Sequence, residues 1–418
     1  MIGCAGGQVS GQGADGQGRS RRVDALVSER SEQILQLVEG LVRLPTYEPA
    51  QCRHAALFVK EKFFEAGFRV ETHDPIDQGG ATAPILLGWL GERTTRPDIL
   101  LCVHIDTSPA GDGWTRDPFG AEQHNGLIYG RGAAVSKSDV GCFLYAAECA
   151  WKSLVNTQGV TIAVAATSDE GAGGNYGAGY LLESLGIRPR LAVFPGFTDV
   201  VTVSHNGCIQ IKVRLVGTAC HQSLLRPKED AMRAATDLCT KIYTMADRLI
   251  ERHSEQLRPT LNVTKVAAGT VFGMAPRQAD VWIDRRVAPQ EDMNAVRDEL
   301  LALVDEVTKA TDCEVTSEVV RMAEPMRSAA SQQAFVSLLK EEARAAFCKN
   351  LEESNSTLYT DARWYSNAGI PTVMYGAGEA DVRVSGANGV DERVPAALLT
   401  QATTILARAM TRFISEPI

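Results

Sequence analysis

The chain has 418 residues, of which 44% are hydrophobic and 22% are charged, and its formal net charge is −9. This length and composition are typical of a soluble globular protein with two domains, and the negative charge without a basic stripe argues against a nucleic-acid partner. No apolar run approaches the roughly 20 residues that a membrane-spanning helix needs, so we expect no membrane partner. The ten cysteines are scattered without a CxxC pair, which favours a reducing, cytoplasmic setting.

The N-terminal part of the chain predicts a tail followed by a helix. Residues 1–22 are rich in glycine and glutamine and contain almost no apolar residues, so we predict that they are disordered. Apolar residues then recur at helical spacing from Val23 to Leu44, which predicts an amphipathic helix that Pro45 ends.

From residue 55 to residue 194, predicted helices alternate with short apolar strands. We expect helices at 55–67 and 140–154, and strands at 85–90, 99–103, 160–167 and 191–194. Alternation of this kind predicts the α/β class, with a mostly parallel sheet that helices cover.

The pattern changes near Asn206. The run IQIKVRLV at 209–216 alternates strictly, which predicts an antiparallel strand with one exposed face. A long helix, two strands and a second helix follow, and together they predict a compact α+β domain of ferredoxin-like type. The α/β pattern then returns and closes with a helix over 396–413. We therefore predict a tail at 1–22, a catalytic domain at 23–205 and 323–418, and an inserted domain at 206–322.

The residues most suited to chemistry follow the apolar strand at 99–103. His104 and Asp106 lie two residues apart, so their side chains project from one face at the carboxyl end of this strand. Ligands bind α/β sheets at that end. The chain continues through Trp114, the run DPF at 117–119 and the run GRGA at 130–133.

The ordered set HxD, W..DPF and GRGA resembles the zinc-dependent family of aminoacylases, acetylornithine deacetylases, succinyl-diaminopimelate desuccinylases and carboxypeptidase G. The resemblance extends from about Ser31 to Ala409. It implies a zinc-peptidase-like catalytic domain with an inserted lid domain, which often mediates dimerisation in the family. It also implies a small amino-acid or peptide-like substrate and a homodimer through the lid at 206–322.

A member of that family holds two zinc ions with five protein ligands, and only the histidine of HxD, His104, is retained here. The other four ligand positions hold Val135, Gly171, Gly196 and Asn388. Valine and glycine have no side-chain donor, and a catalytic zinc usually takes three protein ligands. We therefore predict no metal at these positions and no cofactor. Asp139 and Asp199 are the conceivable substitute ligands.

Other groups of the family's site are retained, and the resemblance implies a role for each. Glu170 corresponds to the general base, and His221 to a lid histidine that reaches a substrate oxyanion. Arg286 corresponds to a contact of the substrate carboxylate. Asp361, in a Thr-Asp-Ala run, and Asn388 are predicted to contact the substrate as well.

Loss of metal ligands beside retained acid/base groups supports a metal-independent enzyme as the leading hypothesis. Glu170 and the His104–Asp106 pair would act on a carboxylate-bearing amino-acid or peptide-like substrate. The reaction is a cyclisation, condensation, elimination, isomerisation or amide or ester cleavage, in a specialised biosynthetic step. One alternative is a non-catalytic ligand-binding protein. Another is a zinc-dependent amidohydrolase with substitute ligands.

Several of these residues also have purely structural interpretations. Arg286 can pair with Asp284 two residues away on the same strand. Ser136 and Ser138 fall near a predicted helix start, where serine more often caps the helix than acts as a nucleophile. His205 belongs to no motif, so a surface position is expected.

Overall fold

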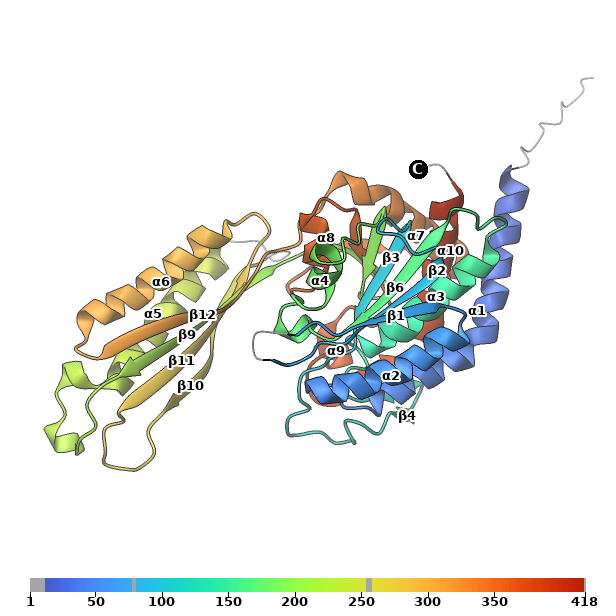
Figure 1. Ribbon diagram of the computed structural model, residues 1–418. Helices are drawn as coiled ribbons and strands as arrows, with labels where there is room; N and C mark the ends of the chain where they lie inside the picture. Colours follow the sequence, from blue (N-terminus) through green and yellow to red (C-terminus); the bar gives the residue numbers. More distant parts are fainter. Residues whose placement is uncertain (1–11, 77–79, 253–257, 417–418) are drawn as a thin grey trace, which may run out of the picture. The chain divides into compact units, whose positions relative to one another are not determined.

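The computed structural model describes residues 12–76, 80–252 and 258–416. The chain divides into two compact units (Figure 1). Unit 1 contains the described parts of Met1–Val203, Ala329–Ser354 and Trp364–Ile418, and unit 2 those of Ser204–Ser328 and Asn355–Arg363. Among the helices of the described ranges, none is long and apolar enough to cross a membrane.

Most of the eight-stranded sheet lies in unit 1, with the strand order β1-β2-β6-β3-β7-β14-β8-β13. Strand β3 pairs in parallel with β6 and β7, and β7 with β14. Antiparallel pairing joins β1 to β2, β2 to β6 and β14 to β8. The predicted α/β class is confirmed, with the parallel strands at the centre of the sheet. The strands are β1 Arg69–His73, β2 Ile85–Gly91, β3 Ile99–His104, β6 Thr161–Thr167, β7 Leu191–Phe194, β8 Val200–His205, β13 Glu352–Ser356 and β14 Thr372–Met374.

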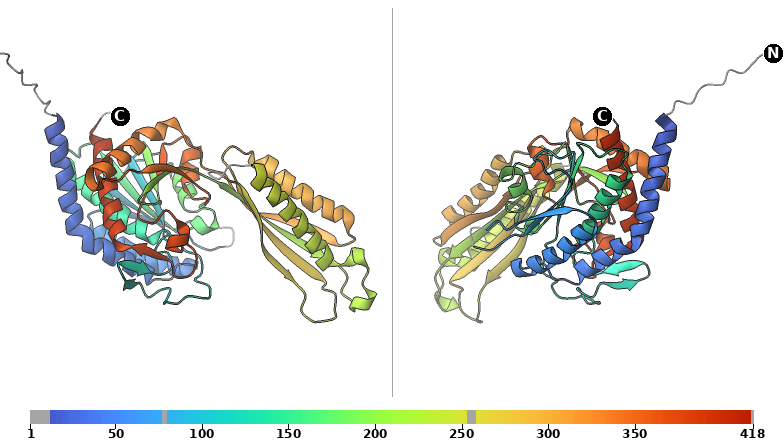
Figure 2. Two further views of the ribbon diagram at one scale, coloured as in Figure 1. Left: turned by 180° about the vertical axis from the view of Figure 1, so that it is seen from behind. Right: turned by 45° about the vertical axis from the view of Figure 1, so that its right-hand side comes forward.

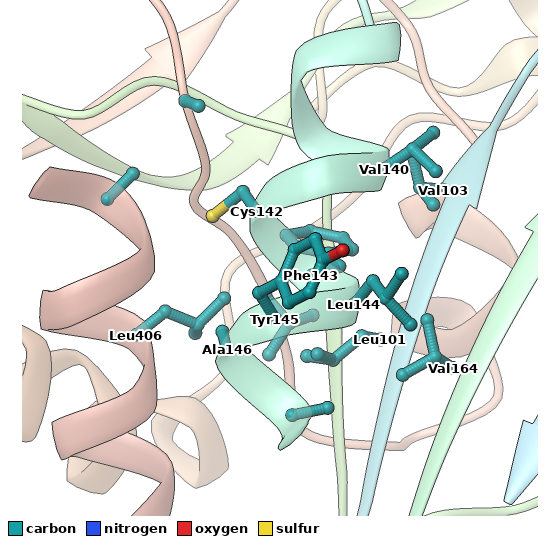
Figure 3. Packing of buried hydrophobic residues seen from close by; sticks show 14 of the residues in the cluster. Leu101, Val103, Val140, Cys142, Phe143, Leu144, Tyr145, Ala146, Val164 and Leu406 are labelled. Carbon is teal, nitrogen blue, oxygen red and sulfur yellow. The ribbon is translucent and has the colours of Figure 1, made fainter. Parts of the chain in front are cut away.

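Helix α3 (Lys137–Ser153) is the centre of the unit 1 core, and all its residues except Trp151 and Lys152 are buried. One side of α3 faces strands β3 and β6, as Figure 3 shows for Val140 and Leu144. Its other side faces α10 (Ala396–Ser415), and α1 (Gln12–Val42) packs on both helices. A helix with apolar residues all round is stable only when neighbours cover it in this way.

Helices α4 (Ala178–Glu183) and α8 (Ala362–Asn367) cover the opposite face of the sheet. Side chains alternate along a strand, so Phe194 of β7 points away from the α3 side. Its ring packs against Tyr365 of α8, with 5.6 Å between the ring centroids. The remaining elements of unit 1 are α2 Pro49–Glu65, α7 Gln333–Phe347, α9 Val382–Ser385 and a small sheet of β15 Arg393–Pro395, β5 Leu127–Tyr129 and β4 Glu122–His124.

The predicted disordered tail is wrong over residues 12–22, because α1 begins at Gln12. Val23 and Val27 are fully buried and anchor the helix on the core. Once a helix is anchored, each further residue gains a backbone hydrogen bond without the cost of nucleation. The extension therefore needs no apolar residues, which is why composition did not reveal it. The other part of the predicted tail, residues 1–11, lies outside the described residues.

Unit 2 is a four-stranded antiparallel sheet with two helices packed on it (Figures 1 and 2). The chain order β9-α5-β10-β11-α6-β12 and the strand order β10-β11-β9-β12 are those of a ferredoxin-like unit, as predicted. Strand β12 was not expected from the sequence. The elements are β9 Gly207–Val216, α5 Ala231–Arg252, β10 Thr260–Ala268, β11 Gln278–Val287, α6 Met293–Ala310 and β12 Glu314–Ala323.

His205 is fully buried at the end of β8, so the expected surface position is wrong. Its Nδ1 lies 2.9 Å from the carbonyl oxygen of Asn206, and its Nε2 accepts the N–H of Thr360 at 3.3 Å. This pattern assigns the neutral tautomer with its proton on Nδ1. Burial lowers the pKa of His205 to about 4, and the charge of Arg363 acts in the same direction.

We expect this histidine to make the protein less stable as the pH falls from about 6.5 to about 4. In that interval the unfolded chain binds the proton and the folded chain does not, so protonation favours unfolding. The loss reaches about 3 kcal/mol at the lower end. Urea unfolding of wild type and His205→Gln across this range measures it, because the variant lacks the titrating group. The stability advantage of wild type should shrink as the pH falls, and a constant difference would contradict the expectation.

Candidate functional site

Four segments of unit 1 meet at the carboxyl ends of its parallel strands. The N–H of Ile105, just after β3, donates to the carbonyl of Thr167 at the end of β6. The N–H of Tyr375, just after β14, donates to the carbonyl of Phe194 at the end of β7. The sheet therefore brings residues that are distant in the sequence together at the carboxyl ends of its strands, which we call the carboxyl edge. Ligands bind α/β proteins there.

His104 and Asp106 lie together at this edge, as their spacing predicts. The Nδ1 atom of His104 is 3.0 Å from the backbone carbonyl of Asp106 and 3.6 Å from its carboxylate Oδ1. The two side chains are 12% and 14% exposed, so solvent still reaches both. A carboxylate in this position orients an imidazole and stabilises its protonated form.

The carboxylate of Asp106 also holds the segment that carries Glu170. Its Oδ2 accepts the N–H of Gly171 at 2.9 Å, and its Oδ1 accepts the N–H of Glu170 at 3.4 Å. Burial by itself raises the pKa of Asp106, but the hydrogen bond and charge of His104, together with these two N–H groups, lower it below its usual value. The Asp106 carboxylate is therefore an anion that lies beside His104 and also binds the backbone of Glu170 and Gly171.

Ser136 contacts the other nitrogen of the same imidazole. Its Oγ lies 2.9 Å from Nε2 of His104, and the residue is fully buried. Ser136 is the residue before α3 and makes no side-chain cap, so the capping role expected for it is wrong. Ser138 is also buried, and its hydroxyl has no hydrogen bond within the described residues. The sequence places Ser136 beside a lost ligand position, which was the one signal that could have drawn attention to it.

The loop that carries Ser136 is held by a second missed residue, Glu392. One carboxylate oxygen accepts the N–H groups of Ala134 and Val135 at 3.0 and 3.1 Å, and the other accepts Arg131 Nη1 at 2.7 Å. Burial raises the pKa of Glu392, while the N–H of Gly132 and the charge of Arg131 oppose that rise. The sequence marked Glu392 only as the end of the late family motif.

The W..DPF motif supports this loop from outside. Trp114 donates its indole N–H to the carbonyl of Ala110 at 2.9 Å, and Arg131 donates to that same carbonyl. The Arg131 guanidinium lies 5.2 Å from the centroid of the Trp114 ring. The three sequence motifs are therefore parts of one structure around Ser136 and His104.

The residues at the family's ligand positions do not fit a dinuclear zinc centre. Val135 and Gly171 offer no side-chain donor, and a Cβ at Gly171 would already lie 3.2 Å from Asp106 Oδ2. At Gly196 a Cβ would lie 2.6 Å from the backbone nitrogen of Tyr375, so the structure has no room for an acid there. In the described ranges, no group of three or more His, Cys, Asp or Glu could hold a metal ion.

The two conceivable substitute ligands are engaged elsewhere. Asp139 is buried, and its Oδ1 accepts the N–H of Ala377 at 2.7 Å. Burial raises the pKa of Asp139 well above its usual value, although this N–H and the charge of His104 oppose the rise. Asp199 is 43% exposed and forms an ion pair with Lys349 at 2.6 Å. Each carboxylate is therefore already paired with another group of the chain.

Asn388, at the fifth ligand position, lies in an exposed loop of unit 1. Its backbone has a φ of 58°, and its Oδ1 accepts the hydroxyl of Ser108 at 3.3 Å. This bond joins the loop after β3 to the loop before β15. Its predicted role as a substrate contact stays a prediction.

His221 lies in unit 2, in an exposed loop that pairs with the β10–β11 connection through Met274. Its Nδ1 accepts the N–H of Ser223 at 3.3 Å. The neutral tautomer then carries its proton on Nε2, which has no hydrogen bond within the described residues. That is the tautomer that an oxyanion donor needs, and the role itself stays a prediction.

Arg286 and Asp361 also belong to unit 2. Arg286 donates through Nε to Asp284 Oδ1 at 2.8 Å, as its structural interpretation predicts, and its side chain is 24% exposed. Its guanidinium also lies 5.5 Å from the centroid of the Tyr359 ring. Asp361 is buried just before α8. Their predicted roles in substrate binding stay predictions.

Comparison with known proteins gives a family match over most of the chain. A model described as peptidase family M20/M25/M40 matches residues 100–412. The acetylornithine deacetylase of Shigella sonnei (strain Ss046) is 30% identical over 253 residues, which are 58% of this chain and 64% of that protein. The chain therefore spans slightly less than two thirds of this curated relative.

Solved structures show the same fold over nearly the whole chain. Human carnosine dipeptidase 1 is 15% identical with a TM-score of 0.76, over 95% of this chain and 100% of that one. A dipeptidase from Saccharomyces cerevisiae is 14% identical with a TM-score of 0.74, over 96% and 99%. A dinuclear metal binding peptidase from Bacillus subtilis is 14% identical with a TM-score of 0.61, over 92% and 98%. At these identities the likeness establishes the fold alone.

Proposed function

The chain belongs to peptidase family M20/M25/M40, and on that premise we propose that it is an enzyme that works without the family's dinuclear metal centre. Its substrate is an amino-acid or peptide-like molecule with a carboxylate. The reaction is acid/base chemistry at the His104–Asp106 pair, with Glu170 as a second proton-transfer group. The family resemblance adds His221 as a catalytic oxyanion donor, and Arg286, Asp361 and Asn388 as substrate contacts.

The observation that carries the proposal is the chain of contacts from Ser136 through His104 to Asp106. The imidazole has a hydroxyl at Nε2 and a carboxylate beside Nδ1, which are the surroundings of a histidine that accepts and returns protons. Asp106 also binds the backbone N–H of Glu170, so a second carboxyl belongs to the same edge. Positioned acid/base groups of this kind accelerate reactions by roughly 100-fold to 10,000-fold.

The setting that we propose is a specialised biosynthetic step. Ordinary deacylation in this family uses water that a metal activates, and the donor set here does not fit that metal. Cyclisation, condensation, elimination and isomerisation need no activated water, whereas amide cleavage is the hardest of the candidate reactions. We further propose a homodimer through unit 2, by analogy with the family.

Metal analysis tests the proposal. Protein purified from zinc-supplemented culture without a chelator is expected to contain far less than one metal ion per chain, and chelation should leave turnover unchanged. The Bacillus subtilis peptidase, purified in parallel, is the control that should retain metal. Two zinc ions per chain, with activity that chelation removes and zinc restores, would contradict the proposal. Ligand binding without turnover would favour a non-catalytic binding protein instead.

A further inference from the structure

Ser136, His104 and Asp106 form a hydroxyl–imidazole–carboxylate series in unit 1. Ser136 Oγ is 2.9 Å from Nε2 of His104, while Nδ1 of His104 is 3.0 Å from the backbone carbonyl of Asp106 and 3.6 Å from its carboxylate. A serine that donates to a histidine whose other nitrogen faces an acid is the arrangement that activates nucleophiles in acyl transfer. The geometry alone identifies these three residues as a series, because their order along the chain does not.

The position of Ser136 also suits a nucleophile. It directly precedes α3, a helix of 17 residues, and its hydroxyl is directed to His104 and not to a helix cap. The N-terminus of a helix carries partial positive charge, which stabilises the oxyanion that forms when a serine attacks a carbonyl. Glu392 fixes the preceding loop through the N–H groups of Ala134 and Val135. These contacts therefore position the hydroxyl before any substrate binds.

We propose that Ser136 is a covalent nucleophile and that the enzyme catalyses acyl transfer from an amide or ester of its amino-acid or peptide-like substrate. This inference rests on the proposed function, in which His104 and Asp106 form the proton-transfer pair. It narrows the reaction to cleavage, cyclisation or condensation through an acyl-enzyme. Elimination and isomerisation need no such intermediate.

The bonds and protons balance in two steps. In the first, Ser136 Oγ forms a bond to the carbonyl carbon while its proton moves to Nε2 of His104. The bond from that carbon to the leaving amine or alcohol breaks, and His104 returns the proton to the leaving group. In the second, water or an amine of the substrate attacks the acyl-serine, and its proton passes to Nε2 of His104, directly or through Glu170. The ester bond breaks, and His104 returns this proton to Ser136 Oγ.

The burial of Ser136 determines how a reagent reaches it. Ser136 has no exposed surface, whereas 12% of the His104 side chain is exposed. A reagent must therefore enter on the imidazole side, and a small electrophile is the appropriate probe. Diisopropyl fluorophosphate meets this need. Its phosphorus bonds to Oγ, fluoride leaves, and the proton passes to His104.

The test is intact-mass and peptide-mass analysis of the full chain after treatment with diisopropyl fluorophosphate. We expect one adduct per chain, on Ser136. His104→Asn should slow its formation by at least about 100-fold, and Ser136→Ala should abolish it. Ser138→Ala is the matched control, because it removes a buried hydroxyl of the same helix turn that makes no hydrogen bond in the described structure. It should label like wild type. No adduct, or an adduct elsewhere, would overturn the inference.

A second variant separates a nucleophile from a hydroxyl that only positions His104. Ser136→Cys retains a nucleophilic atom, so it should react with p-nitrophenyl acetate and accumulate an acetyl-enzyme that mass analysis detects. A positioning role predicts no adduct. If Ser136→Ala turns over substrate like wild type while Glu170→Gln and His104→Asn do not, this inference fails and the proposed function stands. If all three retain full activity, both fail.

Discussion

Replacing Glu170 with glutamine is expected to reduce kcat by roughly 100-fold to 10,000-fold and to leave the free energy of unfolding unchanged. Glutamine has nearly the same shape, but its amide cannot accept or release a proton at neutral pH. Asp106 binds the backbone N–H of residue 170, so the loop keeps its anchor in the variant. Turnover of a panel of N-acyl amino acids and dipeptides, with urea unfolding alongside, measures both quantities.

Glu61→Gln provides the matched control for this experiment. Glu61 is exposed on α2, and the same loss of a carboxylate there should change neither kcat nor stability. Full activity in Glu170→Gln would remove Glu170 from the chemistry. If both kcat and the free energy of unfolding fall in Glu170→Gln, Glu170 supports the fold instead.

The second large effect is expected from Arg131→Met, which should reduce the free energy of unfolding by about 3 to 5 kcal/mol. Arg131 and Glu392 form an ion pair at 2.7 Å in which the side chains are 2% and 0% exposed. Methionine fills much of the volume but leaves Glu392 as a buried carboxylate without its cation. Because Glu392 also holds the loop before Ser136, we expect kcat to fall as well.

The loss of unfolding free energy in Arg131→Met should depend on pH. An unpaired Glu392 can escape its penalty by taking up a proton, so the variant should lose less stability at acidic than at alkaline pH. The double variant Arg131→Met/Glu392→Gln removes the stranded charge and should recover part of the loss. Urea unfolding of all three proteins measures these differences. Equal stability of wild type and Arg131→Met would mean that the pair contributes nothing.

The periodicity of apolar residues predicted those helices and strands that have one buried face and one exposed face. The alternating run at 209–216 corresponds to β9, whose inward positions are buried on the α5–α6 side. Strand β12 runs beside it with the sequence EVTSEVVRMA, and nine of its ten residues are not buried, so neither face of the strand is marked by apolar residues. An edge strand of this kind has no apolar period, so only its pairing with β9 defines it.

The candidate site was predictable where residues are close in the sequence and not where they meet across the fold. The spacing of His104 and Asp106 on one strand end places them together. Ser136 joins them only because α3 packs beside β3, and local sequence favoured a helix cap for it. His205 looked like a surface residue because its partner Thr360 lies 155 positions away. Long-range contacts of this type leave no periodic signal.

The backbone at Gly196 has a consequence for the ancestry of this chain. In a relative that carries an acid at this position, the first side-chain carbon must have space that here is taken by the backbone of Tyr375. A flexible side-chain tip could move aside, but a paired strand cannot do so without disturbing its neighbours. Restoring an acid at residue 196 therefore requires the backbone around Tyr375 to shift as well as the substitution itself.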